Sequence, residues 1–359
     1  MSKTPPRKHS QPAILEPPIP GGKRPRMADV GKKAGVSVCT VSRAFNMPDT
    51  VRPQILERVL KAAQDLNYEL NPAAKALRLQ TTHIFGVVIP TLDHAMFAKL
   101  VNSFQAALRP SGYAPVVITS GFDNRAMFEH VHALVERGAE GLLMVGRVED
   151  QEVRRFIQRT RLPVVTTYSY LEDDVPSIGF DNYQSIRKAI DYLIAHGHRQ
   201  IAMIAGPSLG NDRQISRIQA FRDARQENGI EHEWPVIECS YEGPYIAGAE
   251  ALRTLHALHP QITAVVCNSD TFAVGALLEA QRLGVRVPED LSIIGHDDFE
   301  LASLFSPALS TVVVPAAEMG RRCAEALLNA KRTGLPIKSA QLGASLVIRG
   351  STGPARESI

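Results

Sequence analysis

The first side chains with obvious chemistry are hydrogen-bonding groups that follow a tight turn near the N-terminus. Ala34 and Gly35 supply the turn, and Ser37 comes directly before a helical pattern. A serine at this point predicts a helix start, because its hydroxyl can accept a hydrogen bond from a free backbone N–H of the first turn. Residues 40–43 (TVSR) then add hydroxyl and guanidinium groups. Such groups bond to phosphates and base edges of DNA.

Two short helices joined by this turn must position these groups. Val30, Val36 and Val41 have the spacing of a small apolar core between the helices. The pattern is typical of a helix-turn-helix, whose second helix enters the major groove of DNA. Pro53 opens a third helix at the position where proline is tolerated. Its predicted buried stripe consists of Ile55, Leu56, Val59, Leu60, Ala63 and Leu66.

The charge of the chain is divided unevenly along its length. Residues 1–83 hold 14 lysines and arginines against 6 acidic residues, whereas the rest holds 26 against 31. A basic front end on an acidic body predicts a polyanion partner bound by the front. A solvated basic tail without a partner is the alternative. Residues 1–26, with seven prolines and six basic residues, are expected to be a disordered extension that is inert or adds weak phosphate contacts.

Composition excludes several classes of protein. The 359 residues are 44% hydrophobic and 21% charged, which suits two or three globular domains. No apolar run is long enough for a bilayer, and the N-terminus has no signal-peptide pattern. The four cysteines have neither metal-binding nor disulfide spacing. We therefore expect a cytoplasmic protein with no membrane partner, no cofactor and no metal.

From His83 onward, apolar strands alternate with amphipathic helices. This alternation predicts parallel sheets with helices on both faces, and its length favours two α/β subdomains. The expected strands are 84–90, 114–120, 141–146, 163–168, 177–181, 200–206, 235–240, 263–269 and 291–297, and the expected helices are 95–113, 125–137, 182–196, 213–229, 244–258, 271–283 and 315–333.

Several of these segments resemble one family in order and spacing. GVSVCTVSRAFN, LNYELNPAAKAL, IFGVVIP, GHRQIAMIAG, CNSDTFAVGAL and VPEDLSIIGHDD are similar to the LacI/GalR transcription regulators, from about Met27 to the C-terminus. The resemblance implies an all-α helix-turn-helix headpiece and an α/β core like that of periplasmic sugar-binding proteins, with two parallel-sheet subdomains. It also implies a homodimeric repressor with a hinge helix and a small effector between the subdomains.

Domain boundaries follow from the same resemblance. The headpiece would cover 27–72, the hinge helix or linker 73–82, the core 83–350 and a tail 351–359. The chain would cross between subdomains near 180–182, 310–314 and 336–340. The N-subdomain would then comprise about 83–181 and 313–337, and the C-subdomain about 182–310 and 339–350.

The family pattern places base contacts on the second helix. Arg43 can read guanine O6 and N7 with two parallel hydrogen bonds. Val38 and Cys39 offer only apolar contact or a weak S–H donor, unless Cys39 instead packs into the headpiece. Thr40 and Ser42 either bond to phosphates or support the helix.

Further DNA contacts are implied beyond that helix. Asn46 matches a position near the DNA backbone, and Arg52 stands where the family often has a serine cap. Leu77 aligns with the hinge leucine that enters the minor groove, although residues 73–80 can also be read as a plain linker. The DNA-binding candidates are Ser37, Val38, Cys39, Thr40, Ser42, Arg43, Asn46, Arg52, Ala74, Leu77 and Arg78.

Effector contacts are expected at the carboxyl ends of the core strands, where open α/β sheets bind ligands. The resemblance implies that Arg217 holds an effector hydroxyl or carboxylate and that Asp297 accepts hydrogen bonds from hydroxyls. Ser269 and Asp270 end a strand, although Asp270 is the better candidate for capping the next helix. The remaining candidates are Met96 and Phe97 as an apolar wall, with a core role open for Phe97, and Tyr168.

These side chains are compatible with a neutral sugar, a sugar acid or a nucleobase as the effector. A polyol is favoured because such ligands predominate in the family that the sequence resembles. An enzyme is the main rival function, but no glycine-rich phosphate loop, catalytic triad or zinc cluster stands out. A transport binding protein would lack the headpiece. Activation or corepression remains open, and the absence of a heptad-bearing tail favours a dimer on a palindromic operator over a tetramer.

Overall fold

The computed structural model describes residues 25–69, 81–122 and 126–356, in two compact units divided between Thr81 and Thr82. The first unit is a small helical domain. Its elements are α1 (Met27–Ala34), α2 (Val38–Asn46), the 3₁₀ turn η1 (Pro48–Thr50) and α3 (Pro53–Asp65).

The helices of this first unit begin and end as local chemistry dictates. Gly35 ends α1 in the left-handed conformation (φ 65°), which glycine adopts without a Cβ clash. Ser37 caps α2, because its Oγ accepts a hydrogen bond from the Thr40 N–H at 3.2 Å. Pro53 is the first residue of α3, and Arg52 before it makes no side-chain cap. The predicted helix-turn-helix and third helix are therefore present.

The core of the first unit differs from the predicted stripe at one position. Val30, Val41 and Val59 are fully buried between the three helices. Leu60 is 46% exposed, and Ala62 is buried in its place. Successive helical residues are rotated by about 100°, so Leu60 lies away from a face that is centred on Val59. The prediction that Leu60 is buried was wrong.

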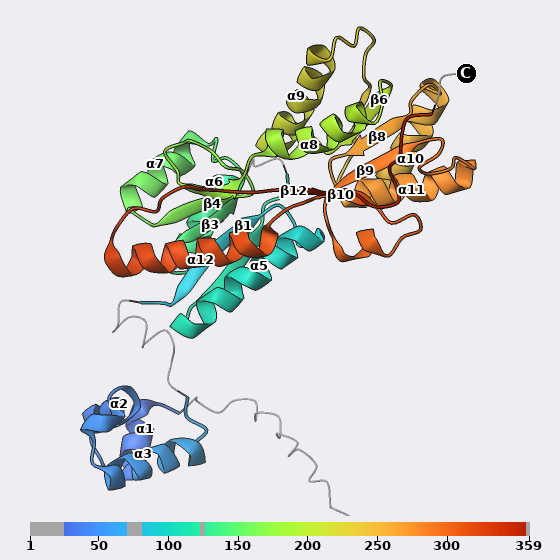
Figure 1. The fold of residues 1–359 in the computed structure, drawn as a ribbon. Helices are drawn as coiled ribbons and strands as arrows, with labels where there is room; N and C mark the ends of the chain where they lie inside the picture. The colour runs from blue at the N-terminus through green and yellow to red at the C-terminus, as the bar shows by residue number, and fades with distance from the viewer. Residues whose placement is uncertain (1–24, 70–80, 123–125, 357–359) are drawn as a thin grey trace, which may run out of the picture. The chain divides into compact units, whose positions relative to one another are not determined.

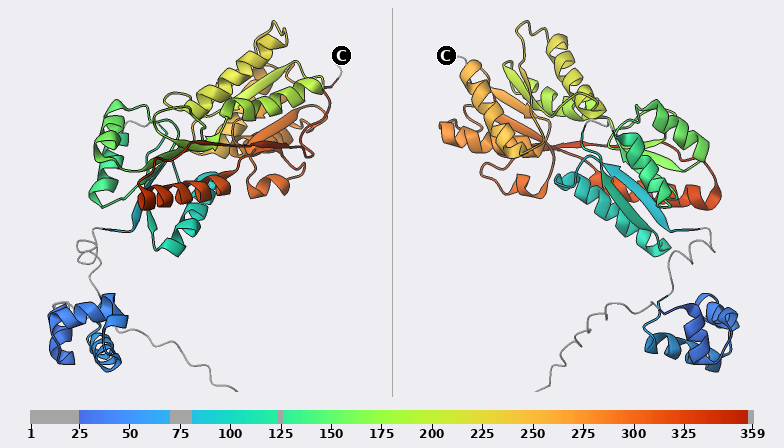
Figure 2. Two further views of the ribbon diagram at one scale, coloured as in Figure 1. Left: turned by 60° about the vertical axis from the view of Figure 1, so that its left-hand side comes forward. Right: turned by 180° about the vertical axis from the view of Figure 1, so that it is seen from behind.

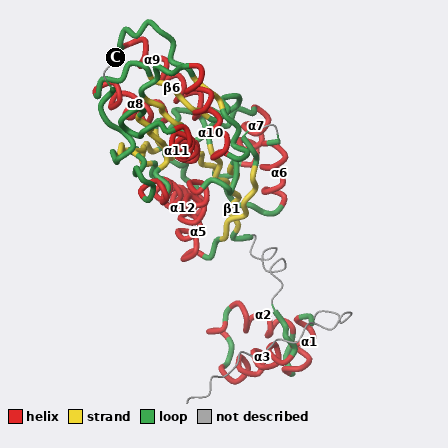
Figure 3. Tube along the Cα trace, turned by 90° about the vertical axis from the view of Figure 1, so that its right-hand side faces the viewer, coloured by secondary structure: helices red, strands yellow, loops and turns green. Residues whose placement is uncertain are grey.

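The second unit contains two six-stranded sheets with helices on both faces (Figures 1 and 3). The first sheet has the order β11-β5-β4-β3-β1-β2 and is parallel throughout. Its strands are β1 (Ile84–Ile89), β2 (Ala114–Thr119), β3 (Leu142–Val145), β4 (Val164–Thr167), β5 (Ser177–Phe180) and β11 (Ala340–Leu342).

The second sheet has the order β12-β10-β9-β8-β6-β7. It is parallel except at β12, which pairs antiparallel with β10. Its strands are β6 (Ile201–Ala205), β7 (Val236–Glu238), β8 (Ala264–Cys267), β9 (Ser292–Asp297), β10 (Ser310–Val313) and β12 (Ser345–Val347).

Helices cover both faces of each sheet because the strands are apolar on both sides. On the first sheet, α5 (Ala95–Leu108) and α12 (Ala316–Thr333) lie side by side on one face, opposite α6 (Met127–Glu136) and α7 (Gln151–Thr160) (Figure 1). On the second, α8 (Asn182–Ala195) and α9 (Asp212–Glu227) face α10 (Pro244–Leu258) and α11 (Asp270–Leu283) across the sheet. The 3₁₀ turns are η2 (Arg109–Ser111) and η3 (Glu300–Ser303).

The chain passes three times between the two subdomains (Figure 2). The first passage, between β5 and α8, falls where the sequence placed it. The second follows β10, because 310–313 pairs within the second sheet. The third lies between β11 and β12, since 340–342 pairs with β5. It therefore falls a few residues beyond the expected 336–340.

The expected tail begins as part of the second subdomain. Ser351 is fully buried, and its Oγ donates to the carbonyl of Ile293 at 2.6 Å. The Gly353 carbonyl contacts His198 Nε2 at 3.0 Å, and the Ala355 N–H donates to the carbonyl of His196 at 2.9 Å. Arg356 also donates to the carbonyl of Pro260 at 2.9 Å, so the chain packs on the core up to Arg356 rather than leaving it at residue 350.

Candidate functional site

A cavity of about 30 Å³ lies between the two subdomains of the second unit. Its walls are the carboxyl ends of strands and the helix starts that follow them. Six of the seven predicted effector contacts line it, namely Met96, Phe97, Tyr168, Arg217, Ser269 and Asp297. The parallel topology brings these residues together from distant parts of the sequence.

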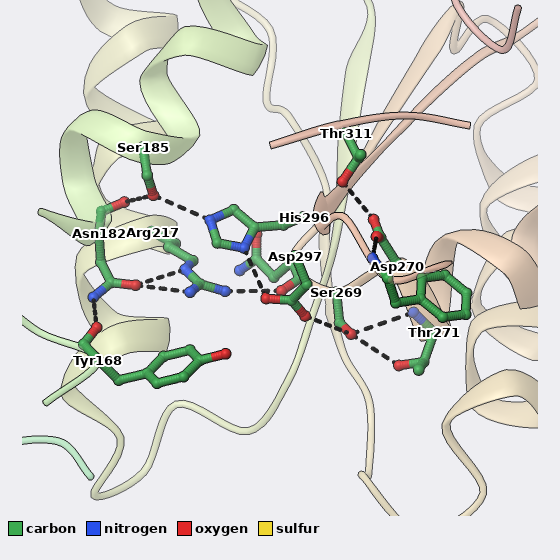
Figure 4. A network of polar contacts seen from close by, with 12 residues as sticks. Tyr168, Asn182, Ser185, Arg217, Ser269, Asp270, Thr271, His296, Asp297 and Thr311 are labelled. Atoms are coloured by element: carbon green, nitrogen blue, oxygen red, sulfur yellow. Dashed lines mark hydrogen bonds and ion pairs between the residues drawn. The ribbon is translucent and has the colours of Figure 1, made fainter. Parts of the chain in front are cut away.

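Arg217 is held by neutral acceptors at the centre of this site (Figure 4). It is 3% exposed, and its Nε and Nη2 donate to Asn182 Oδ1 at 2.9 and 2.7 Å. Its Nη1 donates to the carbonyl of Asn268 at 2.8 Å. Burial lowers the pKa of the guanidinium, against the opposing effect of Asp297. These bonds fix the orientation of the guanidinium before any ligand arrives.

Asp297 presents a carboxylate on the opposite side of the same network. Its Oδ2 accepts a hydrogen bond from Ser269 Oγ at 3.3 Å, and its Oδ1 lies 3.2 Å from His296 Nδ1. Burial, followed by the charge of Arg217, lowers the pKa of His296 to about 4. The histidine is therefore uncharged near neutral pH, and Asp297 forms no ion pair with a lysine or arginine of the described residues.

Two side chains of the cavity stand on unusual backbone. Tyr168 has φ 71° and Asp297 has φ 124°, both in a region that residues with a Cβ seldom adopt. Such conformations persist where the surrounding structure imposes them, and they gather at functional sites. The backbone geometry therefore supports a binding role for the cavity.

Asp270 does not line the cavity, and it does not cap the following helix. Ser269 is the cap of α11, since its Oγ accepts from the Thr271 N–H. Asp270 is buried in the subdomain, where its carboxyl accepts from Thr311 Oγ1 at 2.6 Å and from the Phe299 N–H at 3.0 Å. Burial, followed by the charge of Asp297, raises its pKa to about 8. The predicted capping role of Asp270 was wrong because its side chain faces β10, whereas its role as an effector contact stays a prediction.

Seven of the thirteen residues that line the cavity were not predicted from the sequence. The additional residues are His94, Phe122, Asn211, Arg213, Gln214, Tyr241 and Asn268. The rule that strand ends form the site would have found Tyr241 and Asn268, which follow β7 and β8. Arg213 lies one helical turn before Arg217 and so shares its face of α9.

Several buried polar atoms of the cavity lack a protein partner. Four atoms of the lining have none among the described residues: His94 Nε2, Tyr168 Oη, Asn211 Oδ1 and Asn268 Oδ1. A buried polar atom without a hydrogen bond is costly, at about 1–3 kcal/mol. These atoms therefore favour a ligand that both donates and accepts hydrogen bonds.

Aromatic rings close the mouth of the cavity. Phe122, after β2, stacks on Tyr241, after β7, with ring centres 4.1 Å apart. Tyr241 also receives a hydrogen bond from Gln214 Nε2 at 2.8 Å. Both rings border a wider groove of about 880 Å³ outside the cavity. Entry of a ligand larger than water therefore requires these rings or the subdomains to move apart.

In the first unit, the predicted base-reading side chains are accessible. Val38 is 47% exposed, and Cys39 and Arg43 are also exposed, so Cys39 does not pack into the core. Thr40 and Ser42 are half-buried, and Asn46 Nδ2 donates to the carbonyl of Ser42. Exposed Arg52 precedes α3. Ala74, Leu77 and Arg78 lie outside the described residues.

The described residues show neither a metal-binding cluster nor a membrane-spanning helix. No group of three or more histidine, cysteine or acidic side chains there has the arrangement of a metal site. None of the described helices has the length and apolar character needed to cross a membrane.

Fold and site together define a class of protein: a helix-turn-helix domain joined in one chain to a two-subdomain ligand-binding core. Residues 26–71 match the profile of bacterial regulatory proteins of the lacI family. Residues 190–352 match the periplasmic binding protein-like domain.

Similar proteins of known role extend these matches over most of the chain. The transcriptional repressor CytR of Escherichia coli is 30% identical over 331 residues, covering 91% of this chain and 96% of CytR. The transcriptional regulator GntR of Pseudomonas aeruginosa is 31% identical over 336 residues, covering 92% of this chain and 96% of GntR. The chain belongs to the LacI family of DNA-binding transcription regulators, as its sequence motifs predicted.

Solved structures agree with this assignment. The Lac repressor dimer bound to operator and the anti-inducer ONPF is 27% identical with a TM-score of 0.80, covering 92% of this chain and all of that one (100%). The regulator CelR in complex with cellobiose is 28% identical with a TM-score of 0.66, covering 91% of this chain and 100% of CelR. The expected fold class is confirmed.

Proposed function

We propose that this regulator binds a palindromic operator as a homodimer and that a small polar effector in the cavity between the subdomains changes its operator affinity. The observation that carries the proposal is the buried network of Arg217, Asn182 and Asp297, set among polar atoms that lack a protein partner. The cavity is proposed to bind and not to catalyse, since the similar proteins of known role are regulators.

DNA recognition is proposed to rest on α2. Arg43 would read a guanine, while Val38 and Cys39 would contact apolar base edges such as a thymine methyl. Ser37, Thr40, Ser42, Asn46 and Arg52 would contact the DNA backbone, and Ala74, Leu77 and Arg78 would act in the hinge. The Lac repressor bound to its operator is a dimer, which supports the same assembly for this chain. Because it acts on DNA, we place the protein in the cytoplasm.

The effector is proposed to act by changing the relative position of the two subdomains. Asn182 stands at the first passage between them, and its Nδ2 donates to the Tyr168 carbonyl of the first subdomain at 2.9 Å. Asn182 Oδ1 accepts from Arg217 of the second. A ligand bonded to Arg217 therefore acts on a hydrogen-bond chain that joins the subdomains, and in the dimer this motion would separate the hinge segments and release DNA.

Substitution of Arg217 tests this proposal. A thermal-shift screen of neutral sugars, sugar acids and nucleobases identifies a stabilising compound, and operator affinity is then measured with and without it. We expect operator affinity in Arg217→Ala to be the same with and without the compound. In Arg222→Ala, on the exposed side of α9, the two affinities should differ as they do in wild type. A normal ratio of the two affinities in Arg217→Ala would show that the effector binds elsewhere. The direction of the change in wild type distinguishes induction from corepression.

A further inference from the structure

A second arginine, Arg213, lines the cavity beside Arg217. It belongs to the first turn of α9 and is 7% exposed. Its Nη1 lies 3.1 Å from Asp212 Oδ1, and no other hydrogen bond of its guanidinium is seen within the described part of the chain. A guanidinium has five N–H donors. Arg213 therefore keeps donors for a ligand.

The position of Arg213 places it against the opposite subdomain. A Cβ added to Gly146, at the end of β3, would lie 2.0 Å from Arg213 Nη1. Asp212 Oδ2 also accepts a hydrogen bond from Ser169 Oγ of the first subdomain, at 2.5 Å. The guanidinium thus reaches from the second subdomain to the wall of the first, and a ligand bonded to it contacts both.

The two guanidinium groups of the cavity wall have different partners. The wall contains two guanidinium groups, from Arg213 and Arg217, but one carboxylate, from Asp297. Asp212 pairs with Arg213 from outside the wall. The partners of Arg217 are uncharged oxygens of Asn182 and Asn268. The N–H donors of Arg213 that remain unused therefore fit a ligand group that accepts two parallel hydrogen bonds, as a carboxylate does.

The helix that carries Arg213 adds to the preference for an anion. α9 has 16 residues, and its N-cap residue, Asn211, makes no side-chain capping bond. The N-terminus of a helix attracts negative charge through its backbone dipoles and free N–H groups. Asn211 is 1% exposed, lines the cavity, and its Oδ1 has no partner among the described residues. The Oδ1 of Asn211 accepts hydrogen bonds, so it fits a hydroxyl of the ligand beside the anionic group on Arg213.

The rest of the lining demands hydroxyl groups. Asp297 and the unpartnered Oδ1 of Asn268 can accept hydrogen bonds from a ligand, while Tyr168 Oη can donate one. Burial raises the pKa of Tyr168 well above its usual value, so the phenol keeps its proton. A ligand for this cavity needs several hydroxyls in addition to an anionic group.

We propose that the effector is a polyhydroxylated carboxylic acid, with its carboxylate on Arg213 and its hydroxyls between Arg217 and Asp297. The planar fork of one guanidinium matches a carboxylate through two parallel hydrogen bonds. This inference rests on the proposed function, because it names the ligand class of the same cavity. It makes Arg213 the residue that separates sugar acids from neutral sugars.

Calorimetry with matched ligands tests the inference on the full-length protein. The probes are gluconate, galactonate and glucuronate, each set against the corresponding neutral aldose and alditol, with glucose 6-phosphate as a different anion. We expect at least one acid to bind at least tenfold more tightly than its neutral counterparts and the phosphate. Arg213→Gln should raise the dissociation constant of that acid at least tenfold, and Arg213→Lys should raise it less. Arg222→Gln should leave this dissociation constant unchanged.

Several results would overturn the inference. These are tighter binding of a neutral compound or of the phosphate, binding of none of the acids, or an unchanged dissociation constant of the acid in Arg213→Gln. Circular dichroism of both Arg213 variants shows whether they fold. The proposed function is tested separately. If a neutral sugar binds and changes operator affinity, the cavity remains the effector site and only the proposed ligand class is wrong.

Discussion

The hydroxyl of Ser37 stabilises the start of α2, the helix proposed to recognise DNA. Its Oγ accepts from the Thr40 N–H and lies 2.9 Å from Thr40 Oγ1. Loss of an N-cap of this kind costs about 1 kcal/mol. We therefore expect Ser37→Ala to lower the free energy of unfolding of the DNA-binding unit by about that amount, as measured by urea denaturation of the unit's helical signal. Gln54→Ala, at an exposed position of α3, should change it by less than about 0.5 kcal/mol.

Glu140 organises the point at which the described chain enters the core. Its Oε1 accepts from the backbone N–H groups of Thr82 and His83, the latter at 3.1 Å. Its Oε2 accepts from Tyr113 Oη at 2.8 Å and pairs with Lys331 Nζ at 3.2 Å. Burial alone would raise its pKa, but these bonds outweigh burial and lower the pKa from 4.5 to about 2.

A lowered carboxyl pKa makes this contribution to stability depend on pH. The contribution is complete above pH 4.5 and is lost as the pH falls toward 2, because the unfolded chain takes up a proton first. Between pH 7 and pH 3, wild type should lose about 2 kcal/mol more of its unfolding free energy than Glu140→Gln. Glu129→Gln, at an exposed site, should behave as wild type. Equal losses in wild type and Glu140→Gln would contradict this role of Glu140.

At the residue scale, the sequence predicted those site residues that follow strands or belong to family motifs. It did not predict the site residues whose positions depend on loop conformation and packing. Arg217 and Asp297 follow directly from motifs. Phe122 comes from a loop after β2, and its contact with Tyr241 depends on how the two subdomains face each other. Asp270 carries the right chemistry at a strand end, but its carboxyl is bonded to Thr311 of β10. No sequence pattern sets that direction.

At the scale of elements, α10 and α11 pack closely through two glycines. A Cβ at Gly275 would lie 2.0 Å from the Tyr245 carbonyl oxygen, and one at Gly248 would lie 2.3 Å from that of Phe272. We expect Gly275→Ala to destabilise the core by about 1–3 kcal/mol, because the backbones must separate. Thermal unfolding checks this value. Gly343→Ala, which has open space around its Cβ, is the control and should be close to neutral.

The element pattern of the core was largely predictable because parallel strands buried on both faces are continuous apolar runs. The exceptions have physical causes. α7 is highly charged, with few apolar residues besides Val153, Phe156 and Ile157, so its helical stripe is short. β11 and β12 have three residues each, too few to show a period. The last passage between subdomains was misplaced because it falls between these two strands.

At the scale of the whole molecule, Asn182 is the side chain that joins the effector site to both subdomains. It bonds to Arg217 on one side and to the Tyr168 carbonyl on the other. We expect Asn182→Ala to reduce the effect of the effector on operator affinity at least fivefold, by breaking this connection. Operator titrations with and without effector measure the ratio. Gln184→Ala, two residues further along α8 and exposed, should leave this ratio as in wild type.

The central claim is that the cavity and the DNA-binding unit are energetically coupled, and linkage gives its most direct test. Operator affinity is measured by fluorescence anisotropy with and without the compound that binds the cavity most tightly, acid or neutral. The affinity of that compound is measured by calorimetry with and without saturating operator. We predict that both affinities change by the same factor, about 5-fold or more, because coupling between two binding sites is reciprocal. Operator affinity that stays constant at a saturating concentration of the compound would contradict the claim.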